Sequence, residues 1–262
     1  MLTYETYFAQ WEEFLLIFSR MASFIYVAPF FNTSNVPRKT KLGFGLFTAV
    51  IVLMVLPDQD YTYSGTLGYA ALVAEEVFIG LILGAGCNLT MQIIHFAGRF
   101  IDMDIGLSMA SVMDPTNRTQ NGIVGTIYYY MILLILIVSG LHQYLIAAIV
   151  ESFRWIPIGH VTIHPSLYTT VVNFMGDYFS IGFRITLPVF ASMLLVNCLL
   201  AILAKVAPQM NMFVVGMQLK IIIGLLVLVA TIYLLPVISN FLYEEMKYLL
   251  YELVNDMAPP AP

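Results

Sequence analysis

The sequence predicts an all-α fold, that of a polytopic membrane protein with about six apolar helical segments arranged as hairpins. Hydrophobic residues make up 60% of its 262 positions and charged residues only 10%, whereas soluble domains are about 25% charged. The apolar residues gather in long blocks, and a helix needs roughly 20 of them to cross hydrocarbon. Polar stretches that contain Pro, Gly or Asn separate the blocks, as expected for connections between helices.

Six apolar blocks follow one another along the chain, at residues 14–31, 42–56, 67–96, 123–150, 179–206 and 212–242. The second block is shorter than the roughly 20 residues of a full span. In the third block, Gly80 and Gly84 form a small-residue surface that allows another helix to approach closely. The polar region 151–177 carries Trp155 and is typical of an interfacial loop. A short turn joins the last two blocks, which therefore predict a helical hairpin.

The orientation follows from the one dense group of basic residues, which lies in the connection after the first block. Arg38, Lys39 and Lys41 form this predicted basic loop, and the positive-inside rule places it on the cytoplasmic side. Six alternating segments then put both chain ends on the same, outer side. The net charge of -5 and the absence of a longer basic run exclude nucleic acid as a partner class.

Five charged residues lie inside apolar blocks: Arg20, Glu75, Glu76, Arg184 and Lys220. Even lenient insertion scales assign about 2.5–3.5 kcal/mol to such a group at the centre of a membrane helix. These side chains should therefore face protein or water. Adjacent residues point about 100° apart on a helix, so Glu75 and Glu76 do not make a shared acid and base. We expect ion pairs with Arg or Lys of a neighbouring helix or subunit.

The central stretch, residues 106–122 with the sequence GLSMASVMDPTNRTQNG, interrupts the apolar pattern. Its second half reads as turn and loop, and exposed loop backbone cannot face hydrocarbon at low cost. The helix before it would carry an apolar stripe, and Pro115 would end that helix at Asp114. The stripe consists of Ile101, Ile105, Met109 and Met113. The stretch is therefore predicted to line a cavity or pore, and the alternative is an amphipathic helix followed by an ordinary loop.

No residue pattern predicts catalysis or a bound cofactor. The sequence lacks a phosphate-binding loop and an HExxH zinc motif. His160 and His164 are four residues apart, but Pro165 follows them, so they read as loop histidines. A small-molecule secondary transporter that uses the intramembrane charges is the alternative function. Such transporters usually contain inverted repeats, which this sequence does not show.

Three stretches together resemble one protein family. They read SNVPRKTKLGFGL, GLSMASVMDPTNRTQNGIV and LAKVAPQMNMFVVGMQLKIIIGLLVL, and they are similar to segments of the R subunit of the bacterial flagellar export gate. The same family contains counterparts in virulence type III secretion systems, and the resemblance favours the flagellar branch. It covers essentially the whole chain, including the order and spacing of the blocks.

The resemblance implies an assembly and a domain organisation. In this family one R subunit joins five copies of a P subunit and four copies of a two-helix Q subunit in a closed, helical, protein-conducting channel. Residues 1–178 would resemble P, residues 179–250 would resemble Q, and residues 251–262 would form a tail. Segment 106–122 would be a plug in the pore. The matching plug positions are Gly106, Met109, Ser111, Met113, Asp114, Pro115, Asn117 and Arg118.

The function implied by the resemblance is that of a structural and gating subunit for the export of unfolded proteins, needed for flagellum assembly. Its location would be the bacterial inner membrane, within the flagellar basal body. Further partners would be the B-type switch protein of the export apparatus and components of the basal body and rod. The mechanism would be non-enzymatic and free of cofactors. Met109 and Met113 would help to close the pore, since flexible methionine side chains can repack around different shapes.

Overall fold

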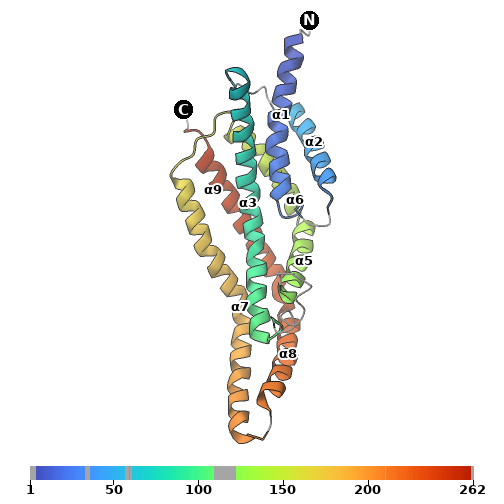
Figure 1. The fold of residues 1–262 in the computed structure, drawn as a ribbon, viewed down its shortest axis with the longest axis vertical. Coiled ribbons are helices and arrows are strands. Elements are labelled where there is room, and N and C mark those ends of the chain that lie inside the picture. Colours follow the sequence, from blue (N-terminus) through green and yellow to red (C-terminus); the bar gives the residue numbers. More distant parts are fainter. Residues whose placement is uncertain are drawn as a thin grey trace. The chain divides into compact units, whose positions relative to one another are not determined.

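The fold was obtained as a computed structural model, which describes residues 4–32, 36–56, 59, 61–108, 122–209 and 211–260. These residues contain helices and no strands, which confirms the all-α prediction (Figure 1). The helices are α1 (Tyr4–Val27), α2 (Arg38–Val55), α3 (Gly65–Ile105), α5 (Ile123–Val138), α6 (Leu141–Trp155), α7 (Ser166–Val206), α8 (Met212–Thr231), the 3-10 turn η1 (Ile232–Leu234) and α9 (Leu235–Met257).

Three helical stretches among the described residues are long and apolar enough to cross a membrane. They are Gly65–Ile105, Ser166–Val206 and Val214–Met257. A fourth crossing is possible if α5 and α6, separated by a break at Gly140, act as one broken span. The chain is therefore a multi-pass membrane protein, as predicted. The first two apolar blocks form α1 and α2, which are not among these candidate spans.

The polar region 151–177 is mostly helical, so the prediction of a long interfacial loop is wrong. Helix α6 continues to Trp155 and α7 begins at Ser166, which leaves residues 156–165 as the connection. Turn hydrogen bonds lead into α7, because the amide of Leu167 donates to the carbonyl of His164 at 3.0 Å and the amide of Tyr168 donates to that of Pro165 at 3.3 Å. The polar side chains of this region fit a helix end as well as a loop.

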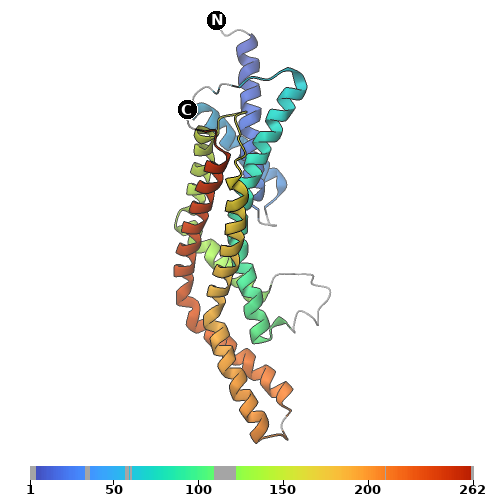
Figure 2. The ribbon, with the colours of Figure 1, turned by 90° about the vertical axis from the view of Figure 1, so that its left-hand side faces the viewer.

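The described residues form two compact units. Unit 1 consists of Met1–Thr90, Gly140–Phe174 and Tyr243–Pro262. In it, α1 and α2 lie side by side, as Figures 1 and 2 both show. Helix α1 also packs on α3 at the small-residue surface expected from the sequence. A Cβ at Gly80 would overlap the carbonyl of Arg20, and one at Gly84 would lie 3.0 Å from the carbonyl of Phe24.

Unit 2 consists of Met91–Ser139 and Met175–Leu242. The C-terminal part of α3 packs on α7 through an aromatic cluster centred on Phe96. Its ring lies 5.3 Å from that of Phe179 and 5.8 Å from that of Phe183, measured between centroids. Gly182 leaves room for this ring, since a Cβ there would overlap it. Helices α7 and α8 run antiparallel after the short turn near residue 209, as both views show (Figures 1 and 2).

Candidate functional site

The predicted plug segment is described only at its two ends. Among the predicted plug positions, Met109, Ser111, Met113, Asp114, Pro115, Asn117 and Arg118 lie outside the described residues. Gly106 is described, and so is Gly122, the last residue of the stretch. The geometry of both ends belongs to unit 2.

Gly106 ends α3. Its φ angle of +93° lies in the left-handed region, which glycine adopts without the steric cost of a side chain. Its amide donates to the carbonyl of Asp102 at 3.0 Å, closing the last turn. The prediction of one continuous helix as far as Asp114 is therefore wrong. Ile101 and Ile105, the part of the predicted apolar stripe that is described, are both fully buried.

Asp102 also contacts the chain just after the segment, a placement that was not predicted from the sequence. Its Oδ1 atom accepts a hydrogen bond from the amide of Val124 at 3.2 Å. Val124 is in the first turn of α5, whose own N-cap residue, Gly122, has no side chain to cap it. The carboxylate of Asp102 therefore caps α5 from a different helix, where the helix dipole favours negative charge.

Two glycines bring α3 and α5 into close contact beside this cap. A Cβ at Gly98 would overlap the Cα of Gly125, and a Cβ at Gly125 would lie 3.4 Å from the carbonyl of His95. One turn further along, the ring of His95 stacks on that of Tyr129, with 4.6 Å between centroids. Backbones can approach this closely only where side chains are absent.

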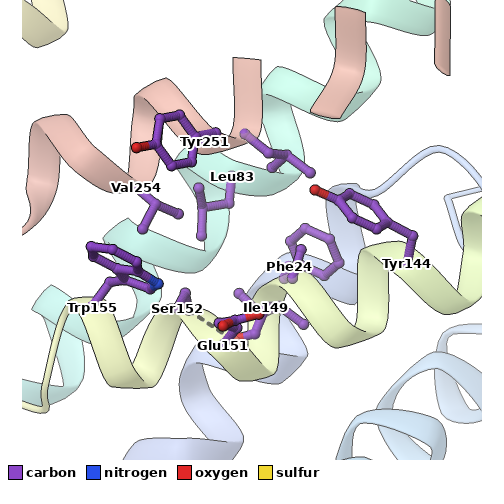
Figure 3. Close-up of a pocket in the computed structure, with 11 residues that line it drawn as sticks. Phe24, Leu83, Tyr144, Ile149, Glu151, Ser152, Trp155, Tyr251 and Val254 are labelled. Atoms are coloured by element: carbon purple, nitrogen blue, oxygen red, sulfur yellow. Dashed lines mark hydrogen bonds between the residues drawn. The ribbon is translucent and has the colours of Figure 1, made fainter. Parts of the chain in front are cut away.

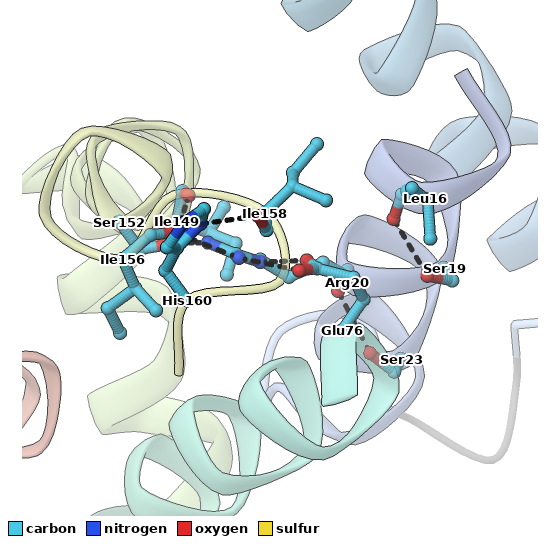
Figure 4. A network of polar contacts seen from close by, with 10 residues as sticks. All are labelled: Leu16, Ser19, Arg20, Ser23, Glu76, Ile149, Ser152, Ile156, Ile158 and His160. Atoms are coloured by element: carbon cyan, nitrogen blue, oxygen red, sulfur yellow. Dashed lines mark hydrogen bonds and ion pairs between the residues drawn. The ribbon is translucent and has the colours of Figure 1, made fainter. Parts of the chain in front are cut away.

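A buried ion pair lies in unit 1, at the crossing of α1 and α3 (Figure 4). Arg20 Nε donates to Glu76 Oε2 at 2.5 Å and Arg20 Nη2 donates to Glu76 Oε1 at 3.0 Å, and both side chains are fully buried. Arg20 also donates to Ser152 Oγ at 3.3 Å and to the carbonyl of Ile156 at 3.0 Å. Its guanidinium lies 4.0 Å from the ring centroid of Phe153. This one side chain thus links α1, α3, α6 and the connection after α6.

The other four predicted charges have different surroundings. Glu75, next to Glu76, is half-buried, and its Oε2 atom finds no hydrogen-bond partner among the described residues. Arg184 is exposed on α7. Lys220 of α8 is half-buried and attracts the carboxylate of Asp104 on α3. Of the five charges, the structure brings Arg20 and Glu76 together.

The basic residues after the first block begin a helix, so the prediction of a basic loop is wrong. Arg38, Lys39 and Lys41 occupy the first turn of α2, which follows Pro37. Proline favours a helix start, although cations are disfavoured there by the helix dipole. Lys41 is buried and donates to Asn32 Oδ1 at 3.3 Å. The buried contact helps to offset the unfavourable position of its charge.

A cavity of about 250 Å³ opens in unit 1 between α1, α3, α6 and α9 (Figure 3). Its floor is apolar and includes the fully buried side chains of Phe24, Leu83 and Ile149. Its rim carries the exposed Trp155 and Tyr251. An apolar group with a polar end would fit this cavity. None of the site residues predicted from the sequence lines it.

Comparison with known proteins identifies relatives over nearly the whole chain. The family described as "Bacterial export proteins, family 1" matches residues 11–246. The "Flagellar biosynthetic protein FliR" of Bacillus subtilis (strain 168) is 31% identical over 244 residues, which cover 90% of this chain and 94% of the relative. Proteins of the same name from Pectobacterium carotovorum subsp. carotovorum and Escherichia coli (strain K12) are 26% and 25% identical, and cover 98% and 95% of this chain and 99% and 96% of the relatives.

Proposed function

Because this chain belongs to family 1 of the bacterial export proteins, we propose that it is the structural and gating subunit of a flagellar protein export gate. Its relatives carry the name flagellar biosynthetic protein, and they are matched over most of their length. The chain is a multi-pass membrane component of that export apparatus. We further propose that it forms part of the channel through which unfolded substrates pass.

The observation that carries the gating role is segment 106–122, a polar insert in an otherwise apolar chain. Its first residue, Gly106, donates its amide to the carbonyl of Asp102, and Val124, two residues after its last residue, donates its amide to Asp102 Oδ1. A segment that leaves and returns at one point can extend into a pore without separating the helices that carry it. Met109 and Met113 would close the pore, because the unbranched methionine side chain repacks around different shapes.

The partners in this proposal are the P-type and Q-type subunits, with this chain present once. Residues 1–178 would pack like a P subunit and residues 179–250 like a Q subunit, in the inner membrane within the flagellar basal body. Many apolar side chains of α7 and α8, such as Leu195, Leu226 and Val229, are exposed in the isolated chain. Exposed apolar surface of this extent supports burial against other subunits or lipid. The B-type switch protein, the rod components and the unfolded substrates would complete the set of partners.

The secondary transporter is disfavoured by the surroundings of the intramembrane charges. Arg20 and Glu76 neutralise each other and have no exposed surface. A substrate would have to displace an ion pair enclosed by protein.

Two experiments test the proposal. Native mass spectrometry of the tagged chain, co-expressed with its chromosomal neighbours, should find one copy in a large hetero-oligomer, and a free monomer or homodimer would contradict the proposal. Deletion of residues 111–120 should raise the ion conductance of the assembled complex in planar bilayers while its subunit composition stays the same. Unchanged conductance would refute the plug.

A further inference from the structure

We propose that the hairpin of α7 with α8 and α9 contains a hinge, formed by Pro188 inside α7 and by the 3-10 turn η1 between α8 and α9. About this hinge the part of the hairpin beyond it, the described residues of segment 189–231, bends against α3 as one arm. The inference does not depend on the proposed gating function. All of the residues that carry it belong to unit 2.

Pro188 interrupts the hydrogen bonds of α7. It lies inside the helix, and proline has no amide hydrogen to donate to the carbonyl four residues earlier, which is that of Arg184. Hydroxyl groups on both sides also bind carbonyls of the helix. Thr186 Oγ1 donates to the carbonyl of Phe183 at 2.7 Å, and Ser192 Oγ donates to that of Pro188 at 2.9 Å. Such bonds weaken a helix and bend it, so the backbone of α7 is weak on either side of Pro188.

The chain that returns along α7 is interrupted as well. Helix α8 ends at Thr231, and the hydrogen bonds that follow reach back three residues instead of four. The amide of Ile232 donates to the carbonyl of Val229, and the amide of Leu235 donates to that of Ile232. Pro236 comes next and has no amide hydrogen for the carbonyl of Ile232. A 3-10 stretch within a long helical run often marks a hinge.

The two interruptions lie at the same level of the hairpin. A cavity of about 10 Å³ is lined by Pro188 and Val189 from α7 and by Thr231 and Leu235 from the returning chain. A gap at this point removes contacts that would otherwise hold the angle of the helices. In Figures 1 and 2 both helices of the hairpin change direction here. A hairpin that is interrupted at one level in both of its helices can bend there without pulling them apart.

The arm beyond the hinge has contacts of its own and one face against α3. Within the arm, a Cβ at Gly216 of α8 would lie 3.4 Å from the side chain of Leu200 of α7. Towards α3, a Cβ at Gly224 would lie 2.6 Å from Ile105 Cγ2. The arm therefore moves as one piece, and a bend at the hinge changes the contact between α8 and the end of α3.

The direct test measures distances by double electron–electron resonance in the intact complex in mild detergent. Cys198 on the arm is exposed and Cys87 is fully buried, so a spin label attaches to Cys198. A second label at Met103→Cys, exposed on α3, reports across the hinge, and one at Leu226→Cys, exposed on α8, reports within the arm. We expect a broader distance distribution across the hinge than within the arm. Equal widths would overturn the inference.

Removal of both prolines should stiffen the hinge. The double variant Pro188→Ala, Pro236→Ala restores an amide hydrogen to each helix, and the distribution across the hinge should narrow to the width found within the arm. Pro208→Ala is the matched control, because Pro208 lies in the turn after α7 and its loss should change neither distribution. An unchanged width in the double variant, or equal narrowing in the control, would refute the hinge.

Hydrogen exchange of the parent complex decides the question if the double variant does not assemble. One missing helix hydrogen bond corresponds to roughly a three- to tenfold change in local opening. After correction for intrinsic rates, amides of residues 185–192 and 228–235 should therefore exchange several times faster than those of residues 196–203 and 217–224 in the same helices. Equal exchange in the two sets would contradict a hinge at this level.

Discussion

Arg20 and Glu76 share two hydrogen bonds, of 2.5 Å and 3.0 Å, in a place where neither side chain has any exposed surface. The pair joins α1 to α3 in unit 1, and the remaining donors of Arg20 reach Ser152 and the carbonyl of Ile156. Full hydrogen bonding is what makes a buried charge tolerable. This network therefore fixes the packing of three helices.

Glu76→Gln should destabilise unit 1 strongly. It leaves the charge of Arg20 buried without a counter-charge, and breaking a buried pair in this way costs about 3–5 kcal/mol. Thermal unfolding of the complex in mild detergent would measure the loss. Glu75→Gln is the matched control and should have little effect, since this neighbour takes no part in the pair. Equal effects of the two variants would contradict the structural role of Glu76.

Replacement of both partners should restore most of that loss. In the double variant Arg20→Met, Glu76→Leu no charge remains buried, and apolar groups of similar volume often replace such pairs at little cost. The same unfolding measurement applies. A double variant that is less stable than Glu76→Gln would show that the contacts of Arg20 with Ser152 and Ile156 matter more than its charge.

Gly80→Ala should weaken the contact between α1 and α3. The added methyl group would overlap the carbonyl of Arg20 and the hydroxyl of Ser23, and overpacking of this kind costs about 1–3 kcal/mol. The control is Gly43→Ala in α2, where a Cβ meets no atom within 4 Å. That change should stabilise the helix by about 0.5–1 kcal/mol. A lower melting temperature for both variants would argue against the packing explanation.

Asp256→Ala should release the C-terminal end of α9 from the start of α7. The buried carboxylate of Asp256 accepts hydrogen bonds of 2.6 Å from the hydroxyls of Ser166 and Thr170. Its loss leaves two hydroxyls without their acceptor, at a cost of about 1–3 kcal/mol. Limited proteolysis should then cut the C-terminal tail faster. Glu252→Ala, one turn earlier in α9, is the control and should leave the cleavage rate unchanged.

Tyr61 should lose its proton only at high pH, and the stability of unit 1 should fall as it does so. Burial, together with the charges of Glu13 and Glu12, raises the pKa of Tyr61 to about 12 from its ordinary value of 10.0. A raised pKa in the folded state adds stability that is complete below pH 10 and is lost as the pH rises towards 12. Tyr61→Phe should remove this pH dependence. The difference in tyrosinate absorbance between the parent and Tyr61→Phe, followed against pH, would give the titration midpoint of Tyr61. A midpoint near pH 10 would contradict the burial of this ring.

The fold class could be predicted from the sequence because apolar content and the length of apolar blocks are properties of each stretch of chain by itself. The sequence also identified Arg20 and Glu76 as charges that need protein neighbours, since lipid would make them too costly. It could not choose between Glu75 and Glu76. The two are adjacent, and the choice depends on which face of α3 meets α1.

Helix ends and the candidate site were harder to predict. The helix was predicted to end at Asp114 because of Pro115, whereas Gly106 ends it earlier by adopting a left-handed conformation. The sequence analysis assigned no role to Asp102. The signal that could have found Asp102 is weak, because its partner is a backbone amide in another helix, with no recognisable side chain.

The sequence by itself determined that this protein is helical, crosses a membrane and carries a polar insert in its middle, because hydrophobicity and turn propensity belong to the residues themselves. Only the tertiary structure decided which charges pair, where the helices cross and which residue caps the helix that follows the insert. Those outcomes depend on contacts between residues far apart in the chain, such as Arg20 with Glu76 and Asp102 with Val124. Their geometry arises when helices pack, and no local pattern encodes it.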